Sequence, residues 1–140
     1  MRTILDTDVV VAALRSSSGA SAELLRRLEK GHLTLLLSVP LALEYETICQ
    51  LPEHRLAAGL SYREVEVFVN TLIGLAEPVE IHYRWRPQSR DPGDEMVVEA
   101  AVNGSADALV TFNRRDFGTV HKVFGIDVLL PREALARITT

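Results

Sequence analysis

The stretch ILDTDVVVAAL, residues 4–14, places two carboxylates between two apolar runs. Residues 3–5 are predicted to form a short strand that runs into Asp6. The segment 8–14 is ambiguous, because Val9, Val10 and Val11 favour a strand whereas the Ala-Ala-Leu that follows favours a helix. Unpaired acids at the end of a buried strand are costly. Asp6 and Asp8 are therefore expected to have partners.

Strand and helix patterns alternate along the rest of the chain. The continuous apolar run 33–37 is typical of a strand buried on both faces. Short strands are also predicted at 78–83, 108–111 and 126–130, and helices at 22–30 with Ser21 as its cap, 38–50 with Ser38 as its cap, 56–75 as one or two helices, 91–104 and 132–138. This alternation predicts one α/β domain over residues 1–140, with a small, mostly parallel sheet flanked by helices on both faces. Ligands of such sheets bind beyond the carboxyl ends of the strands.

Composition narrows the class of protein. The chain has 140 residues, of which 47% are hydrophobic and 24% charged, and no apolar run approaches the roughly 20 residues of a membrane span. The net charge of -4 argues against a general nucleic-acid coat protein. Cys49 stands alone, and the first residues do not resemble a signal peptide, so a cytoplasmic protein away from the membrane is expected.

Acidic residues recur where the predicted elements meet the same edge of the sheet. Asp6 and Asp8 follow the first strand, and Asp116 follows the strand 108–111. Asp91 and Asp94 open a helix, in which Asp94 shares the apolar face with residues 97, 98 and 101, whereas Glu95 and Glu99 fall outside that face. Asp91 fits an N-cap, and Asp94 fits either a residue that stabilises the helix dipole or a residue that reaches into a site.

The helix 38–50 offers Glu44 and Glu46, on opposite edges of its apolar face, and periodicity does not choose between them. Carboxylates about 4 Å apart repel by about 4 kcal/mol per pair near a protein surface. A cluster of such acids would need a divalent cation to stay ionised. Oxygen ligands without a His/Cys cluster favour Mg²⁺ or Mn²⁺.

Three segments together resemble the PIN-domain ribonucleases, and most closely the VapC-like toxins of bacterial toxin–antitoxin pairs. They are ILDTDVVVAAL, SVPLALEYETI and DPGDEMVVEAAVNGSADALVTFNRRDF. The likeness covers most of the chain and keeps the order of the motifs. It implies a PIN-like fold and a metal site of three or four acids.

The resemblance also implies roles for individual residues. Asp6, Glu44 and Asp94 would hold Mg²⁺ or Mn²⁺, with Asp116 completing the site, although many relatives place an Asp where this chain has Asn113. Asp8 departs from the commoner Asn or Ser, and would support the site or add to it. The metal ligands would be supported by residues that do not bind the metal themselves, namely Thr7, Asp91 and Thr111. The implied reaction is hydrolysis of RNA that leaves a 3'-hydroxyl and a 5'-phosphate, and the implied partners are a cognate antitoxin and a second copy of the chain.

Two groups of arginines are candidates for RNA contact. Arg114 and Arg115 lie between Asn113 and Asp116. The segment IHYRWRPQSR, residues 81–90, interleaves Arg84, Arg86 and Arg90 with aromatic residues, which suits phosphates and stacked bases. An exposed strand, or a surface for the antitoxin or a dimer, fits the same segment.

Two other functions fit parts of the sequence. Asp6-Thr7-Asp8-Val9-Val10 matches the first motif of haloacid-dehalogenase-type phosphatases, in which Asp6 would be the nucleophile and Asp8 the acid/base. That family needs a lysine between its Ser and its last acids, and Lys30 and Lys122 both lie outside that interval. A catalytically inactive PIN-like binding module is the second alternative.

Overall fold

The computed structural model describes residues 1–82 and 92–139, and it confirms a parallel α/β fold. Five strands pair in parallel in the order β3-β2-β1-β4-β5. Their bounds are β1 Arg2–Leu5, β2 Thr34–Leu37, β3 Glu77–Pro78, β4 Ala108–Val110 and β5 Asp127–Leu129. The first strand is therefore central, with β2 on one side and β4 on the other.

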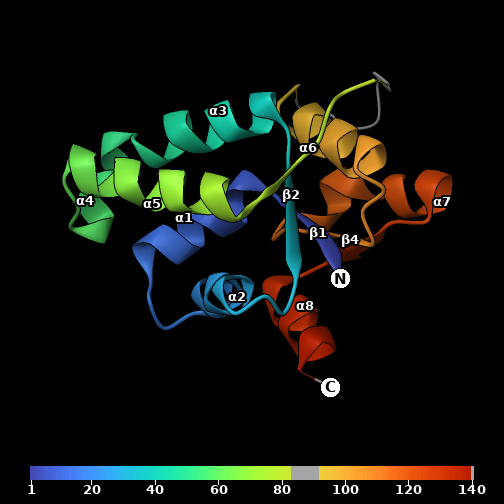
Figure 1. The fold of residues 1–140 in the computed structure, drawn as a ribbon, viewed down its shortest axis with the longest axis horizontal. Helices are drawn as coiled ribbons and strands as arrows, with labels where there is room; N and C mark the ends of the chain where they lie inside the picture. Colours follow the sequence, from blue (N-terminus) through green and yellow to red (C-terminus); the bar gives the residue numbers. More distant parts are fainter. Residues whose placement is uncertain (83–91, 140) are drawn as a thin grey trace.

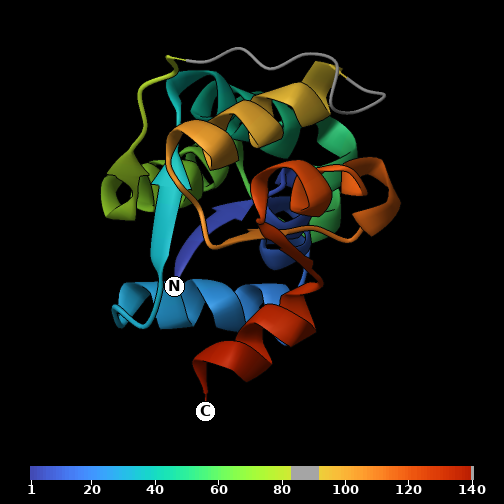
Figure 2. The ribbon, with the colours of Figure 1, turned by 90° about the vertical axis from the view of Figure 1, so that its right-hand side faces the viewer.

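Helices pack on both sides of this sheet. Helix α6 contacts β1 and β2, and α8 contacts β4 and β5. Figures 1 and 2 show α2 and α8 together on one side of the molecule and α3, α5 and α6 on the other. The helices are α1 Thr7–Arg15, α2 Ala20–Glu29, α3 Val39–Cys49, α4 Pro52–Ala58, α5 Tyr62–Leu75, α6 Pro92–Asn103, α7 Val120–Phe124 and α8 Pro131–Ile138, with a 3-10 turn, η1, at Arg114–Phe117.

The ambiguous segment after Asp6 is a helix. The side chain of Asp6 accepts a hydrogen bond from the Thr7 backbone N–H and so caps α1. Val9 and Val10 are fully buried, and α1 packs against α2, α3 and α4. Burial on these neighbours outweighs the intrinsic preference of valine for strands.

The core lies on both faces of the central strands. Ile4, Leu35, Leu36 and Leu109 are fully buried, as expected for strands covered on both faces. Within residues 1–82 and 92–139, no helix is long and apolar enough to span a membrane.

Three details differ from the sequence-based expectation. Helix α2 begins at Ala20 with Gly19 as its N-cap, and the expected cap, Ser21, lies inside the helix. The strand expected at 78–83 is reduced to β3, since residues 79–82 form no strand and residue 83 lies outside the described residues. Glu95 and Glu99 are buried, because α6 contacts α3 and η1 as well as the sheet and so buries more than its apolar face.

Candidate active site

The site is at the point where the chain reverses its direction of travel across the sheet. From β1 the chain moves outward to β2 and β3, then returns to place β4 on the other side of β1. Asp6 follows β1 and Thr111 follows β4, so both lie at the carboxyl ends of neighbouring strands. This switch point is the usual place for ligands in open parallel sheets.

Asp6 is held firmly on both of its carboxylate oxygens. Its backbone N–H donates to the Val110 carbonyl at 2.9 Å. Its Oδ1 accepts from the Thr7 backbone N–H at 2.8 Å, and its Oδ2 accepts from the Thr111 hydroxyl at 2.8 Å. Only 7% of the residue is exposed. The side-chain hydroxyl that supports Asp6 is thus that of Thr111, whereas Thr7 contributes its backbone.

Asp8 ties the loop after β4 to the start of α1. Its Oδ2 accepts from the Phe112 backbone N–H at 3.0 Å and from the Asn113 side-chain amide at 3.3 Å. Its Oδ1 is buried and has no hydrogen-bond partner among the described residues. Asp8 therefore supports the loop with one oxygen and leaves the other available to a ligand.

Burial makes both acids costly to ionise. Burial raises the pKa of Asp6 above its ordinary value, and hydrogen bonds from Thr111 and Thr7 oppose that shift without cancelling it. Burial, and then the charge of Asp6, raise the pKa of Asp8 to about 7. Near neutral pH the pair therefore shares a proton that a cation would displace.

Asp116 approaches this pair from η1. It is half-buried, its backbone N–H donates to the Asn113 carbonyl at 3.0 Å, and its charge contributes to the raised pKa of Asp6. The side chain of Asn113 is engaged with Asp8 instead. Of the two candidates for the fourth position, Asp116 is the one whose charge acts on Asp6.

Glu44 and Asp94 are half-buried on α3 and α6. These two helices contact each other, and α6 also contacts β1 and η1. In the part of the chain that the structure describes, no three His, Cys, Asp or Glu side chains form a group that could hold a metal ion. The full ligand set of Asp6, Glu44, Asp94 and Asp116 stays a prediction.

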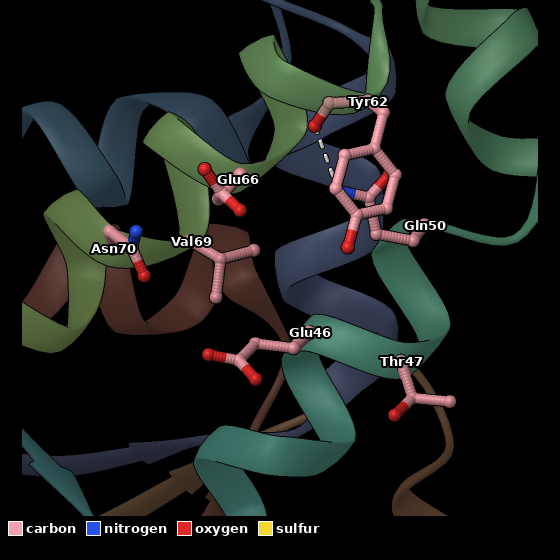
Figure 3. Close-up of a pocket in the computed structure, with 7 residues that line it drawn as sticks. All are labelled: Glu46, Thr47, Gln50, Tyr62, Glu66, Val69 and Asn70. Carbon is pink, nitrogen blue, oxygen red and sulfur yellow. Dashed lines mark hydrogen bonds between the residues drawn. The ribbon is translucent and has the colours of Figure 1, made fainter.

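Glu46 lies in a different place. It is exposed and lines a hollow of about 460 Å³ between α3 and α5, together with Gln50, Tyr62 and Glu66 (Figure 3). The Gln50 side-chain amide bridges the two helices by donating to the Tyr62 carbonyl at 2.8 Å. Glu66 is paired with Arg63.

The donors at the switch point fit a hard divalent cation. Asp6 and Asp8 offer carboxylate oxygens, burial raises the pKa of both, and Asp8 Oδ1 is buried with no hydrogen-bond partner among the described residues. Oxygen-only donor sets suit Mg²⁺ and Mn²⁺.

The predicted RNA-binding arginines are only partly described. Arg114 is exposed and pairs with Glu133 at 3.0 Å, and Arg115 is exposed on η1, beside Asp116 in sequence. Arg84, Arg86, Arg90 and Asp91 lie outside the described residues.

Tyr45 is a contributor that sequence reasoning missed. It is fully buried in α3, and its hydroxyl donates to the Leu5 carbonyl, one residue before Asp6, at 2.5 Å. The pairing between β1 and β2 ends at Thr3 and Leu35. The hydrogen bond from Tyr45 therefore holds the last part of β1, where β2 no longer pairs with it. A tyrosine on the apolar face of a helix gives no sequence signal for this contact.

Comparisons with known proteins identify the family. No curated protein sequence matches this chain. Among solved structures, a chain from VapBC2 of Rickettsia felis, bound to a DNA fragment from their promoter, is similar with a TM-score of 0.58 and 14% identity, over 91% of this chain and 97% of that one. That likeness concerns the fold. The PIN domain family matches residues 2–115, and the chain belongs to this family.

Proposed function

We propose that this protein is a metal-dependent endoribonuclease and the toxin of a toxin–antitoxin pair. The observation that carries the proposal is the pair Asp6 and Asp8 at the switch point, with raised pKa values and a buried carboxylate oxygen that has no hydrogen-bond partner in the described part of the chain. Membership of the PIN domain family supports the same reading. It also argues against the phosphatase alternative, whose first motif would be Asp6-Thr7-Asp8-Val9-Val10.

Each acid has a part in the proposed site. Asp6, Glu44, Asp94 and Asp116 would hold Mg²⁺ or Mn²⁺, with Asp8 beside them. The cation would activate water and neutralise charge that develops on the phosphoryl group. Thr111 orients the Asp6 carboxylate, and Asp8 fixes the loop that leads to Asp116. Arg115 and Arg114 would meet the phosphates of the RNA backbone.

The proposed partners follow from the same reading. The toxin would act on RNA in the cytoplasm and be held inactive by a cognate antitoxin. We also propose that it forms a homodimer. Of the large apolar side chains that are exposed within the described residues, five lie on α3 and α5: Val39, Leu43, Tyr62, Val67 and Leu75. On α5 only the exposed side chains are candidates for this interface, since Val65, Val69 and Leu72 of the same helix belong to the core.

The central test compares wild type with Asp6→Asn, which keeps the size of the side chain and removes its charge. Purified wild-type protein, free of antitoxin, should cleave single-stranded RNA with Mg²⁺ or Mn²⁺ and stop when EDTA is added. Asp6→Asn should lower the cleavage rate by at least about a hundredfold, because loss of a group that stabilises transition-state charge typically has that effect. Cleavage is followed on gels with end-labelled RNA.

Glu46→Gln is the matched control, since Glu46 is exposed in the hollow between α3 and α5. It should cleave at the wild-type rate and arrest growth on induction as wild type does. If wild type cuts no RNA with either cation and calorimetry detects binding of neither cation, the enzyme hypothesis is wrong and the protein is an inactive binding module.

A further inference from the structure

A second concave site lies next to the carboxylate pair. It is a groove of about 510 Å³ between the end of α1, the start of α2, the start of α8 and Phe112. Ala12, Phe112, Leu130 and Pro131 give it a mostly apolar lining. Its volume is within the range of small-ligand sites. We call it the α2 groove.

The α2 groove contains a buried hydroxyl that makes no hydrogen bond within the described part of the chain. Ser21 lines the groove and is 3% exposed, and its Oγ has no hydrogen-bond partner among the described residues. Buried polar atoms are nearly always hydrogen-bonded, since an unmet hydroxyl costs about 1–3 kcal/mol. A ligand with a polar edge would supply the missing bond.

The charge around the groove favours an anion. Helix α2 begins in the groove, and its N-cap, Gly19, offers no side chain to the N–H groups of the first turn. Such helix ends attract phosphate. Among the described residues that line the groove, Arg132 is the charged one and none is an acid, although the whole chain carries a net charge of -4.

The groove adjoins the proposed active site at Phe112. Phe112 donates its backbone N–H to Asp8, while its side chain lines the groove, and the residue is 49% exposed. Ala12, on the α1 side, is one helical turn after Asp8. A polymer held at the acids therefore reaches the groove within a short distance.

We infer that the α2 groove holds an unpaired nucleotide of the RNA, next to the bond that is cut. The base stacks on Phe112 and bonds its polar edge to the Ser21 hydroxyl, and its phosphate faces Arg132 and the start of α2. Stacking on aromatic side chains is the common way in which proteins hold single-stranded bases. This inference rests on the proposed ribonuclease function.

A nucleotide explains the groove better than a side chain of a protein partner. An aliphatic side chain would fill the apolar lining but leave the Ser21 hydroxyl without its bond. It would also make no use of the positive charge of Arg132 and of the α2 N-terminus.

The test separates binding from catalysis with an end-labelled single-stranded RNA in Mn²⁺. Phe112→Ala should raise KM about tenfold, because stacking of one base is worth roughly 5- to 150-fold in affinity, with a smaller effect on kcat. Phe112→Tyr should restore the wild-type KM. Val123→Ala, which truncates an exposed apolar side chain on α7, is the matched control and should change neither constant.

Ser21→Ala gives a readout that a structural role would not produce. The Ser21 hydroxyl has no bond to lose among the described residues, so its removal should leave the unfolding midpoint unchanged or raise it. The same variant should raise KM about fivefold, because a bond to the base is lost. Arg132→Gln should lower the salt dependence of RNA binding by about 0.7 in log–log slope, measured by anisotropy in EDTA.

The outcomes distinguish this inference from the proposed function. If wild type cuts RNA while Phe112→Ala and Ser21→Ala keep its KM, the groove is not a nucleotide site and the ribonuclease stands. If these variants instead lose affinity for the cognate antitoxin and keep the wild-type KM, the groove binds the protein partner, and the inference is overturned. If wild type neither binds nor cuts RNA, both fail.

Discussion

At the scale of single residues, Asp8 is the side chain whose role the structure changes most. Its sequence position left open whether it adds to the acidic cluster or supports it. The structure shows support, through the bonds of Oδ2 to Phe112 and Asn113. Asp8 Oδ1 has no hydrogen-bond partner within residues 1–82 and 92–139, so the same side chain also offers an oxygen to a cation.

The raised pKa of Asp8 predicts how stability depends on pH without metal. Between its ordinary value of 3.8 and about 7, the folded protein holds a proton at Asp8 that the unfolded chain releases. The contribution of Asp8 to the free energy of unfolding is therefore fully present below about pH 4 and is lost as the pH rises through about 7. In EDTA, the wild-type Tm should fall between pH 5 and 8 relative to that of Asp8→Asn, by a few degrees for a domain of this size.

Added Mn²⁺ should reverse this trend. The cation must displace the shared proton, so it should raise the wild-type Tm more at pH 8 than at pH 6. Thermal melts at both pH values measure this difference. Parallel pH profiles for wild type and Asp8→Asn in EDTA would contradict the assignment.

At the scale of elements, the short strands and long helices were predictable, whereas the packing between them was not. The run 33–37 is uniformly apolar and indicated a buried strand, which is β2. The valines after Asp8 left α1 undecided, because their strand preference competes with burial against α2 and α3. Ser21 resembled a helix cap in sequence, but the helix begins earlier and turns it into the α2 groove.

In the candidate site, too, local features were predictable from the sequence and long-range contacts were not. The acids at strand and helix ends were visible in sequence because their spacing is local. The bond from Thr111 to Asp6 joins residues 105 positions apart, and the burial of Glu95 depends on which helices lie around α6. Such contacts follow from tertiary packing, which local patterns do not contain.

Close packing at the end of α6 gives a test at this scale. A Cβ on Gly104 would lie 2.9 Å from the Ala100 carbonyl oxygen and from a methyl of Val79, and 3.0 Å from Leu36. Because one of these atoms is backbone, it cannot move aside cheaply. Gly104→Ala should lower the free energy of unfolding by about 1–3 kcal/mol in urea titrations.

Gly74→Ala is the matched substitution for that experiment. Gly74 lies within α5, and a Cβ there would meet nothing within 4 Å. Alanine should therefore stabilise the protein by roughly 0.5–1 kcal/mol through helix propensity. Equal effects of the two substitutions would show that the packing around Gly104 is looser than described.

At the scale of the whole molecule, the exposed apolar side chains of α3 and α5 predict the oligomeric state. Wild type should sediment as a dimer at micromolar concentration. The double variant Leu43→Glu/Val67→Glu should sediment as a monomer, because it places charges where both residues are now apolar and exposed. Val123→Glu on α7 should remain a dimer, and a wild-type monomer at these concentrations would exclude this interface.

The strand order has a consequence for the synthesis of the protein on the ribosome. A ribosome makes Asp6 and Asp8 before the strand β4 that pairs with β1 and before the loop that Asp8 holds, since Phe112 follows Asp8 by 104 positions. Pairing of such distant segments is slow, since the intervening chain must first be closed into a loop. A chain interrupted before β4 would carry both acids without the loop that fixes them. For a protein proposed to cut RNA, the topology itself delays activity until β4 and the loop after it have been made.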